Sequence, residues 1–229
     1  MKPHSRFAPF SDYMGLLCRL DTPRKVQDFL DYGLAYNDSK PNTCYSPLET
    51  LRRGRAHCIE GAMLAAAAFL FHGRRPLLLD LRANPRDDDH VIAPFTERGR
   101  WGAVAMSHFC GLRYREPVYA SYAELARSYF EFYYNSSGEK TLREFSVPLD
   151  ARGLPEEWLY SGKNVFFVSR LLDAARHFRI VPARDEGSLR RADSLLFEAE
   201  MMGGSRAPLT RRRPRRYAAL RDIEASRKR

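Results

Sequence analysis

The feature that most constrains this chain is an uncharged apolar stretch of eleven residues from Gly61 to Phe71, which ends in His72-Gly73-Arg74-Arg75. One broad helical face has Ile59, Ala62, Met63, Ala66, Phe69 and Leu70. The remaining positions are also apolar: Leu64, Ala65, Ala67, Ala68 and Phe71. A helix that is apolar on every side must be surrounded by the rest of the protein. We therefore predict a central buried helix over about 57–72, with Gly73 as its C-cap. The stretch is too short to span a bilayer.

Two shorter helices are predicted before this central helix. Leu20-Asp21-Thr22-Pro23 is a helix-start signal, and apolar residues follow it at helical spacing, so we expect a helix over 23–34. Ser46-Pro47-Leu48-Glu49 places a proline in a first helical turn and a glutamate as the capping-box partner. We expect this second helix to end near Gly54.

After the central helix the pattern changes to strands. Residues 76–82, 90–95 and 101–107 are predicted strands, joined by a polar turn and by a glycine-containing hairpin connection. One buried helix followed by an antiparallel sheet predicts an α+β fold in which the helix packs on the sheet. In the carboxy-terminal half we expect extended segments at 117–119, 145–149 and 164–169 and helices over 122–134, 170–178 and 188–202.

Cys58 and His90 together suggest nucleophilic chemistry. Cys58 is in the first turn of the buried helix, where unpaired N–H groups and the helix dipole favour a thiolate. The same N–H groups are suited to receive the oxyanion that forms when a thiolate attacks an acyl carbon. His90 opens the second predicted strand, from which an imidazole can reach the helix start and move the proton.

These residues also resemble a known family. Ala56-His57-Cys58-Ile59-Glu60-Gly61-Ala62, with the strand after it, His90 and Arg100-Trp101, is similar to the core of the transglutaminase-like superfamily, relatives of papain-type cysteine enzymes. In that superfamily a Cys opens a central helix, with an acidic residue two positions later and a small residue four positions later. A His opens the next core strand, and a Trp stands on the following strand. The resemblance covers roughly residues 45–107.

The resemblance implies a papain-like or transglutaminase-like core and thiol-dependent acyl transfer or hydrolysis at an amide bond of a peptide or protein. Cys58 would be the nucleophile and His90 the general base and acid. The third catalytic residue departs from the family pattern, because Ala105 stands where an Asp is expected. Strand alternation puts Ser107 on the same face, so we name Ser107 as the residue that orients the His.

The sequence departs from the family pattern at two further positions, and it leaves open which residue orients the His. Ala56 stands where the superfamily commonly has Gly, and Ile92 where it usually has an aromatic residue. Three carboxylates are alternatives to Ser107 as the orienting group: Asp80, Asp88 and Asp89. A third group mainly fixes the tautomer and orientation of the His, so it need not be charged. A binding protein of the same fold that has lost catalysis is the first alternative function.

The net charge of +10 is concentrated at the carboxyl end. Residues 206–229 contain ten Lys/Arg and two Asp/Glu, and the 44% hydrophobic content of the chain is typical of a globular protein. We therefore expect a single domain over 1–205 and a basic, disordered tail over 206–229. The tail arginines suggest weak contact with nucleic acid or an anionic surface, the second alternative function: Arg211, Arg212, Arg213, Arg215 and Arg216.

The remaining expectations concern the compartment and cofactors. Met1 to Asp12 has no apolar segment of a secretory signal, and no transmembrane segment is evident, so a cytoplasmic setting is expected. The four cysteines form no CxxC pair and are expected as free thiols. No metal or organic cofactor is implied.

Overall fold

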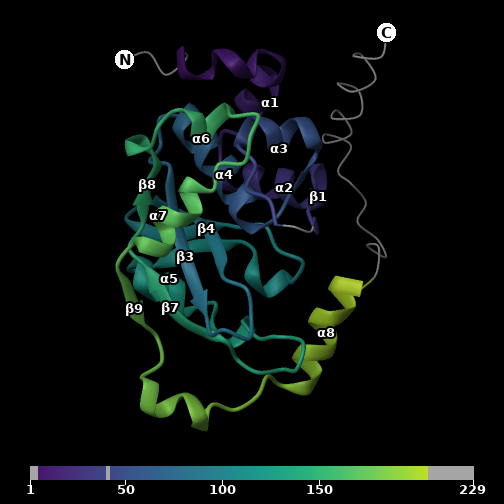
Figure 1. Cartoon of the computed structure of the whole chain (residues 1–229), viewed down its shortest axis with the longest axis vertical. Helices are drawn as coiled ribbons and strands as arrows, with labels where there is room; N and C mark the ends of the chain where they lie inside the picture. The colour runs from purple at the N-terminus through teal and green to yellow at the C-terminus, as the bar shows by residue number, and fades with distance from the viewer. Residues whose placement is uncertain (1–4, 40–41, 206–229) are drawn as a thin grey trace.

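The fold is built around helix α4 (Cys58–Phe71), which stands where the sequence predicts the central helix. The computed structural model describes residues 5–39 and 42–205 of the chain (Figure 1). Every residue of α4 from Ile59 to Phe69 is buried. One side of α4 packs on strand β4 of the sheet, and helices α2 and α3 pack around it. Small side chains in the middle of α4 allow these neighbours to approach closely.

Every described strand pair in the seven-stranded sheet is antiparallel. The combination of helices with an antiparallel sheet confirms the predicted α+β class. The strands of the sheet lie in the order β6-β5-β4-β3-β7-β9, and β8 pairs with the end of β3. The strands are β3 (Leu77–Ala83), β4 (His90–Glu97), β5 (Arg100–Val104), β6 (Arg115–Tyr119), β7 (Leu142–Ser146), β8 (Leu149–Asp150) and β9 (His177–Arg179). The three strands predicted first, β3 to β5, are adjacent in the middle of this order.

The hairpin between β4 and β5 has the turn chemistry that its sequence predicts. Arg98 and Gly99 are its two loop residues, and both have positive φ, 48° and 72°. Two-residue loops of this kind match the twist of the strands that they join. Alternation along β4 sends Val91 and Ala93 toward α4 and Ile92 to the opposite face of the sheet.

Helices cover the α4 side of the sheet, and their starts follow the capping rules. The Thr22 side chain caps α2 and the Ser46 side chain caps α3, each by accepting an N–H three residues later. Gly54 ends α3 in the left-handed conformation. The helices on this side are α1 (Met14–Arg19), α2 (Pro23–Gly33), α3 (Pro47–Arg53), α6 (Glu157–Tyr160) and α7 (Phe167–Ala174). A parallel pair of short strands, β1 (Ala35–Tyr36) and β2 (Arg55–Ala56), leads into α4.

The prediction of an extended segment at 164–169 is wrong. Phe167 begins helix α7, which ends at Ala174, and the chain then forms β9 instead of continuing the predicted helix to 178. Val165 and Val168 are buried whereas Phe166 is 38% exposed, which is helical spacing. A short apolar run does not distinguish strand from helix, and here tertiary packing selects the helix.

The predicted helices over 122–134 and 188–202 also differ in extent. Within 122–134, α5 (Tyr122–Arg127) is followed by a separate 3-10 turn, Phe130–Phe132. Between them, Tyr129 packs in the core on the sheet face opposite α4. In place of a helix over 188–202, the structure has α8 (Ser194–Ser205).

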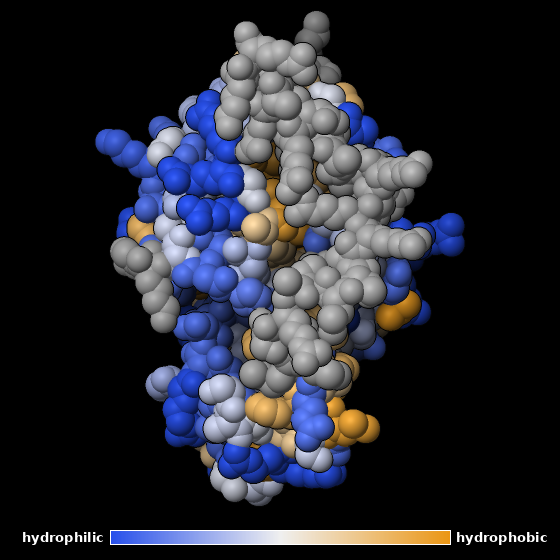
Figure 2. All heavy atoms as spheres, turned by 90° about the vertical axis from the view of Figure 1, so that its right-hand side faces the viewer, coloured by the Kyte–Doolittle hydropathy of each residue, from blue (hydrophilic) through white to orange (hydrophobic). Residues whose placement is uncertain are grey.

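Helix α8 lies at the lower right of Figure 1. Figure 2 shows this side of the molecule, with hydrophilic side chains over much of the visible surface and hydrophobic ones gathered at the α8 end. Leu195 of α8 is 75% exposed. The predicted basic tail, with Arg211 to Arg216, lies outside the described residues. Within 5–39 and 42–205 no helix has the length and apolar character needed to cross a membrane.

Candidate active site

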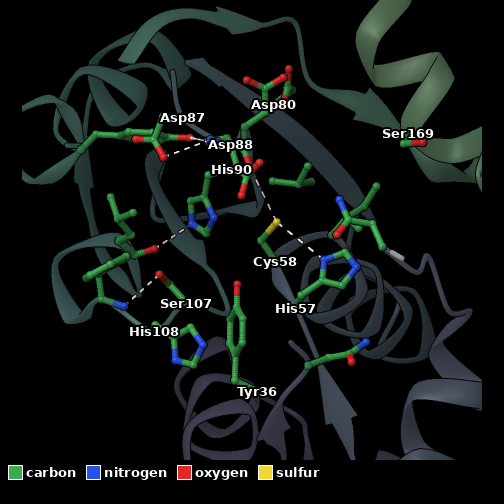
Figure 3. Close-up of a pocket in the computed structure, with 18 of the residues that line it drawn as sticks. Tyr36, His57, Cys58, Asp80, Asp87, Asp88, His90, Ser107, His108 and Ser169 are labelled. Atoms are coloured by element: carbon green, nitrogen blue, oxygen red, sulfur yellow. Dashed lines mark hydrogen bonds between the residues drawn. The ribbon is translucent and has the colours of Figure 1, made fainter. Parts of the chain in front are cut away.

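A cavity of about 480 Å³ opens at the amino-terminal end of α4 (Figure 3). Its walls come from α4, the loop after β1, the turn between β3 and β4, the segment after β5, and α7. Cys58, His90 and Ser107, the three residues predicted from the sequence, all line it. The structure therefore brings together side chains that are up to 49 positions apart in the sequence.

Cys58 is the first residue of α4 and lies between two imidazoles (Figure 3). Its Sγ is 3.9 Å from His57 Nδ1 and 3.8 Å from the main-chain oxygen of Asp89. Burial by itself raises the pKa of this thiol, but interactions with His57 and His90 outweigh burial and lower the pKa to about 5. At neutral pH the sulfur is therefore a thiolate, which is the nucleophilic form.

His57 was not among the predicted catalytic residues, yet it is a direct neighbour of the sulfur. Its Nε2 donates to the main-chain oxygen of Thr43 at 2.6 Å, and its Nδ1 faces Cys58. Burial lowers the pKa of His57, but Cys58, Glu60 and the Thr43 carbonyl together raise it to about 9. His57 is thus an imidazolium beside a thiolate. Its position directly before the cysteine, as the N-cap residue of the helix, is the sequence signal that identifies it.

Glu60 fixes the backbone around this pair. The side chain is fully buried and accepts hydrogen bonds from the side chains of Asn37 and Thr43 and from the N–H groups of Tyr45 and His57, at 2.7–3.0 Å. A buried carboxylate with four donors is well satisfied. The sequence suggests only a dipole-complementing role for this residue. In the structure it ties the loop after β1 to the start of α4.

A main-chain carbonyl holds the ring of His90. His90 Nε2 lies 2.8 Å from the oxygen of Leu112, which leaves Nδ1 for the sulfur side. Tyr129 and Tyr133 pack edge-on against the ring, with centroids 6.4 Å away in each case. A neutral carbonyl can fix the tautomer and the orientation of the ring, as the third residue of a triad does.

Ser107, predicted to orient His90, has a different partner. Its Oγ accepts the N–H of Phe109 at 3.1 Å, so Ser107 shapes the loop that precedes Leu112. The Leu112 carbonyl takes the place that the sequence analysis gives to Ser107 or to a carboxylate.

Of the three carboxylates considered as substitutes, two have other partners, and no described hydrogen bond joins the third to His90. Asp80 pairs with His177, Oδ2 to Nε2, at 3.0 Å. Asp89 Oδ1 accepts the N–H of Ala83 at 2.7 Å. For Asp88 the described contacts are those of its main chain, whose oxygen accepts the hydroxyl of Tyr133. Ala105 is buried, and the amide of Gln27 pairs with both its N–H and its C=O.

Tyr36 contributes a hydroxyl that the sequence analysis did not identify. The residue lies in β1, and Figure 3 shows its hydroxyl pointing toward Cys58. Its ring stacks on the imidazole of His108 at a centroid distance of 3.7 Å, and His108 Nε2 pairs with Asp38 at 2.8 Å. Burial and the charge on Cys58 raise the pKa of Tyr36 well above its usual value, so the hydroxyl keeps its proton. It can donate a hydrogen bond to an oxygen bound next to the sulfur.

No protein-family model matches the chain, and no curated protein matches it either. The functional argument therefore rests on the geometry of this site.

Proposed function

We propose that this protein catalyses thiol-dependent acyl transfer or hydrolysis at an amide bond, with Cys58 as nucleophile and His90 as the group that carries the proton. The observation that supports this most directly is the environment of Cys58. A cysteine at a helix start, with its pKa lowered to about 5 and its sulfur opening on a cavity of about 480 Å³, is suited to nucleophilic attack.

In the proposed reaction the thiolate attacks the amide carbonyl carbon, and a C–S bond forms while the carbonyl oxygen becomes an oxyanion. The Cys58 N–H has no acceptor within the helix and can receive this oxyanion, together with the Tyr36 hydroxyl. The C–N bond then breaks, and His90, which has taken the proton of the Cys58 thiol, gives it to the leaving amine. Water or a second amine then attacks the resulting thioester and gives a proton to His90, the C–S bond breaks, and Cys58 leaves as the thiolate. Both outcomes share the acyl-enzyme.

Two histidines at one sulfur require different roles. His57, with its pKa raised to about 9, remains charged throughout and stabilises the thiolate. His90, with Nε2 held by a carbonyl, presents Nδ1 to the reacting groups. We therefore assign proton transfer to His90 and electrostatic support to His57.

The test compares an amide substrate with an activated ester of the same acyl group. The ester has a leaving group that needs no proton, so general-acid assistance matters for the amide only. His90→Ala should abolish amide turnover, while the ester still acylates Cys58, more slowly than in the parent because His90 also lowers the thiol pKa; intact mass detects the acylation. His57→Ala should slow both reactions, because the thiol pKa rises. Cys18→Ser, which removes an exposed cysteine, is the matched control for Cys58→Ser.

The proposal fails if Cys58→Ser reacts with the activated ester as fast as the parent protein does. It also fails if Cys58 in the native protein is not alkylated by iodoacetamide at pH 6. At that pH an unperturbed thiol, with a pKa near 8.5, is less than about 1% ionised. In that case the alternative of a binding protein without catalysis would replace the enzyme.

A further inference from the structure

The cavity next to Cys58 is acidic in a protein with net charge +10. Its lining includes six aspartates: Asp38, Asp80, Asp87, Asp88, Asp89 and Asp173. Among the described residues that line it, none is a Lys or an Arg. The aspartates outnumber the His57 imidazolium, and walls in which one sign of charge predominates raise the local concentration of ligands of the opposite sign. This contrast between the cavity and the whole chain is the starting point of the inference.

Three of these carboxylates converge. Oxygen atoms of Asp80, Asp89 and Asp173 all lie within 4.8 Å of one another. Asp80 is buried and paired with His177, whereas Asp89 and Asp173 are exposed. Burial raises the pKa of Asp80 to about 6, and the charge of Asp89 acts in the same direction, against His177. Arg82 and His177 act on Asp80 and Asp89 in the opposite direction, so the cluster sets three carboxylates against two basic side chains.

The carboxylates with the fewest protein partners face solvent. The structure gives the side chains of Asp88 and Asp173 no hydrogen bond or ion pair with any described residue, and both are exposed at the cavity. Figure 3 shows Asp80, Asp87 and Asp88 grouped beyond His90 and Cys58, on the other side of the cavity from Tyr36. These carboxylates and the sulfur of Cys58 therefore line one cavity.

We infer that the site takes cationic substrates, in which a Lys side chain or another alkylammonium group lies next to the reactive amide and is received by Asp88, Asp89 and Asp173. An ammonium has three N–H donors; oxygen atoms of Asp89 and Asp173 lie within 4.8 Å of each other, and Asp88 lines the same cavity, so the three carboxylates offer an acceptor for each donor. A calcium ion instead requires six to eight oxygens. The inference rests on the proposed function for its substrate, but the preference for positive charge at Cys58 can be measured without turnover.

The first test measures the charge preference of Cys58 directly, with two thiosulfonate reagents of similar size. One has a trimethylammonium group and the other a sulfonate group. Cys18 and Cys110 are replaced by Ser, and Cys44 is buried, so the reaction reports on Cys58. Relative to free cysteine, the cationic reagent should be favoured by about tenfold at low ionic strength, and salt near 1 M should remove most of this preference.

The matched variants assign that preference to the cavity. The double substitution Asp88→Asn with Asp173→Asn should reduce the preference by about threefold or more, because each charge acts over a short distance. Asp185→Asn, which removes an exposed carboxylate outside the cavity lining, should leave it unchanged. A ratio equal to that of free cysteine, unaffected by the double substitution, would overturn the inference.

The second test uses three peptide amides that differ only in the residue next to the reactive carbonyl: Lys, Met or Glu. The expected order of kcat/KM is Lys, then Met, then Glu, and the double variant should lower the value for Lys only. Equal kcat/KM for all three would overturn the inference and leave the proposed function intact. Charge-selective labelling without turnover of any amide would overturn the proposed function alone. Saturable loss of the preference with Mg²⁺ or Ca²⁺ near 1 mM would assign the cluster to a metal ion and overturn the inference.

Discussion

Glu60 is the residue on which the geometry at the start of α4 depends. Its carboxylate accepts four hydrogen bonds and is fully buried. In Glu60→Gln an NH₂ group replaces one oxygen and faces donors, so at least one buried donor loses its partner. We expect a loss of roughly 2–4 kcal/mol in the free energy of unfolding, measured by urea denaturation.

Glu60→Gln should also raise the pKa of the Cys58 thiol. Removal of the Glu60 charge lowers the pKa of His57, and the weaker imidazolium then raises the pKa of Cys58, so alkylation of Cys58 should require higher pH. Glu156→Gln, in a partly exposed ion pair with Arg6, is the control and should cost less than about 1 kcal/mol. Unchanged stability together with an unchanged alkylation profile would contradict this role of Glu60.

At this scale the sequence could identify Cys58 and His90, because a cysteine at a helix start and a histidine at a strand start are visible as patterns. It could not identify what holds the ring. The Leu112 carbonyl belongs to the main chain, so no residue type marks it. Ser107 was the expected partner because strand alternation was extended to it, but β5 ends at Val104, and Ser107 lies beyond it in a segment without regular secondary structure.

Among the elements, α4 lies unusually close to the segment that follows β5. A Cβ added at Gly61 would lie 2.5 Å from Cβ of Met106 and 3.7 Å from Leu30. Gly61→Ala should therefore destabilise the protein by roughly 1–3 kcal/mol, although alanine favours helices. Gly15→Ala in α1, where the nearest neighbour is the end of Arg19 at 3.8 Å, should be neutral or stabilising. Thermal unfolding of both variants provides the comparison, and equal effects would contradict the close packing.

The elements that the sequence predicted well are those with a strong local signal. α2 and α3 have a cap residue and a proline in the first turn, and β4 and β5 are joined by a two-residue loop with positive φ. The segment at 165–168 had no such signal. Its four apolar residues fit a strand as well as a helix. The helix is selected by tertiary packing, in which Val165 and Val168 are buried on the α4 side of the sheet, and the local sequence does not contain this information.

For the molecule as a whole, Asp80 makes stability depend on pH. Its pKa is about 6 in the folded protein and near 3.9 in an unfolded chain. The folded state therefore binds more protons between about pH 4 and pH 6, and the free energy of unfolding falls as pH rises through this range. A shift of about two pH units corresponds to a cost of at most ~3 kcal/mol at neutral pH.

Asp80→Asn should remove this cost, because asparagine keeps an oxygen that can accept from His177. The variant should be more stable than the parent at pH 7, and the difference should vanish below about pH 4. Urea denaturation across pH 4–7 measures it, with Asp185→Asn as a control that should follow the parent. A constant difference across this range would show that the ionisation of Asp80 is not its source.

The Leu112 carbonyl affects which positions of this site tolerate substitution. Substitution of residue 112 changes the side chain and leaves the peptide oxygen in place, and the carbonyl does not titrate at physiological pH. A mutational scan would therefore find intolerance at positions 58 and 90 but no third position of equal severity. Intolerance would instead be spread over the residues that shape the turn Cys110–Leu112, such as Ser107 through the Phe109 N–H. Substitutions in that turn should be tolerated only where they keep the path of its backbone, and a side chain at Gly111 would meet Phe132.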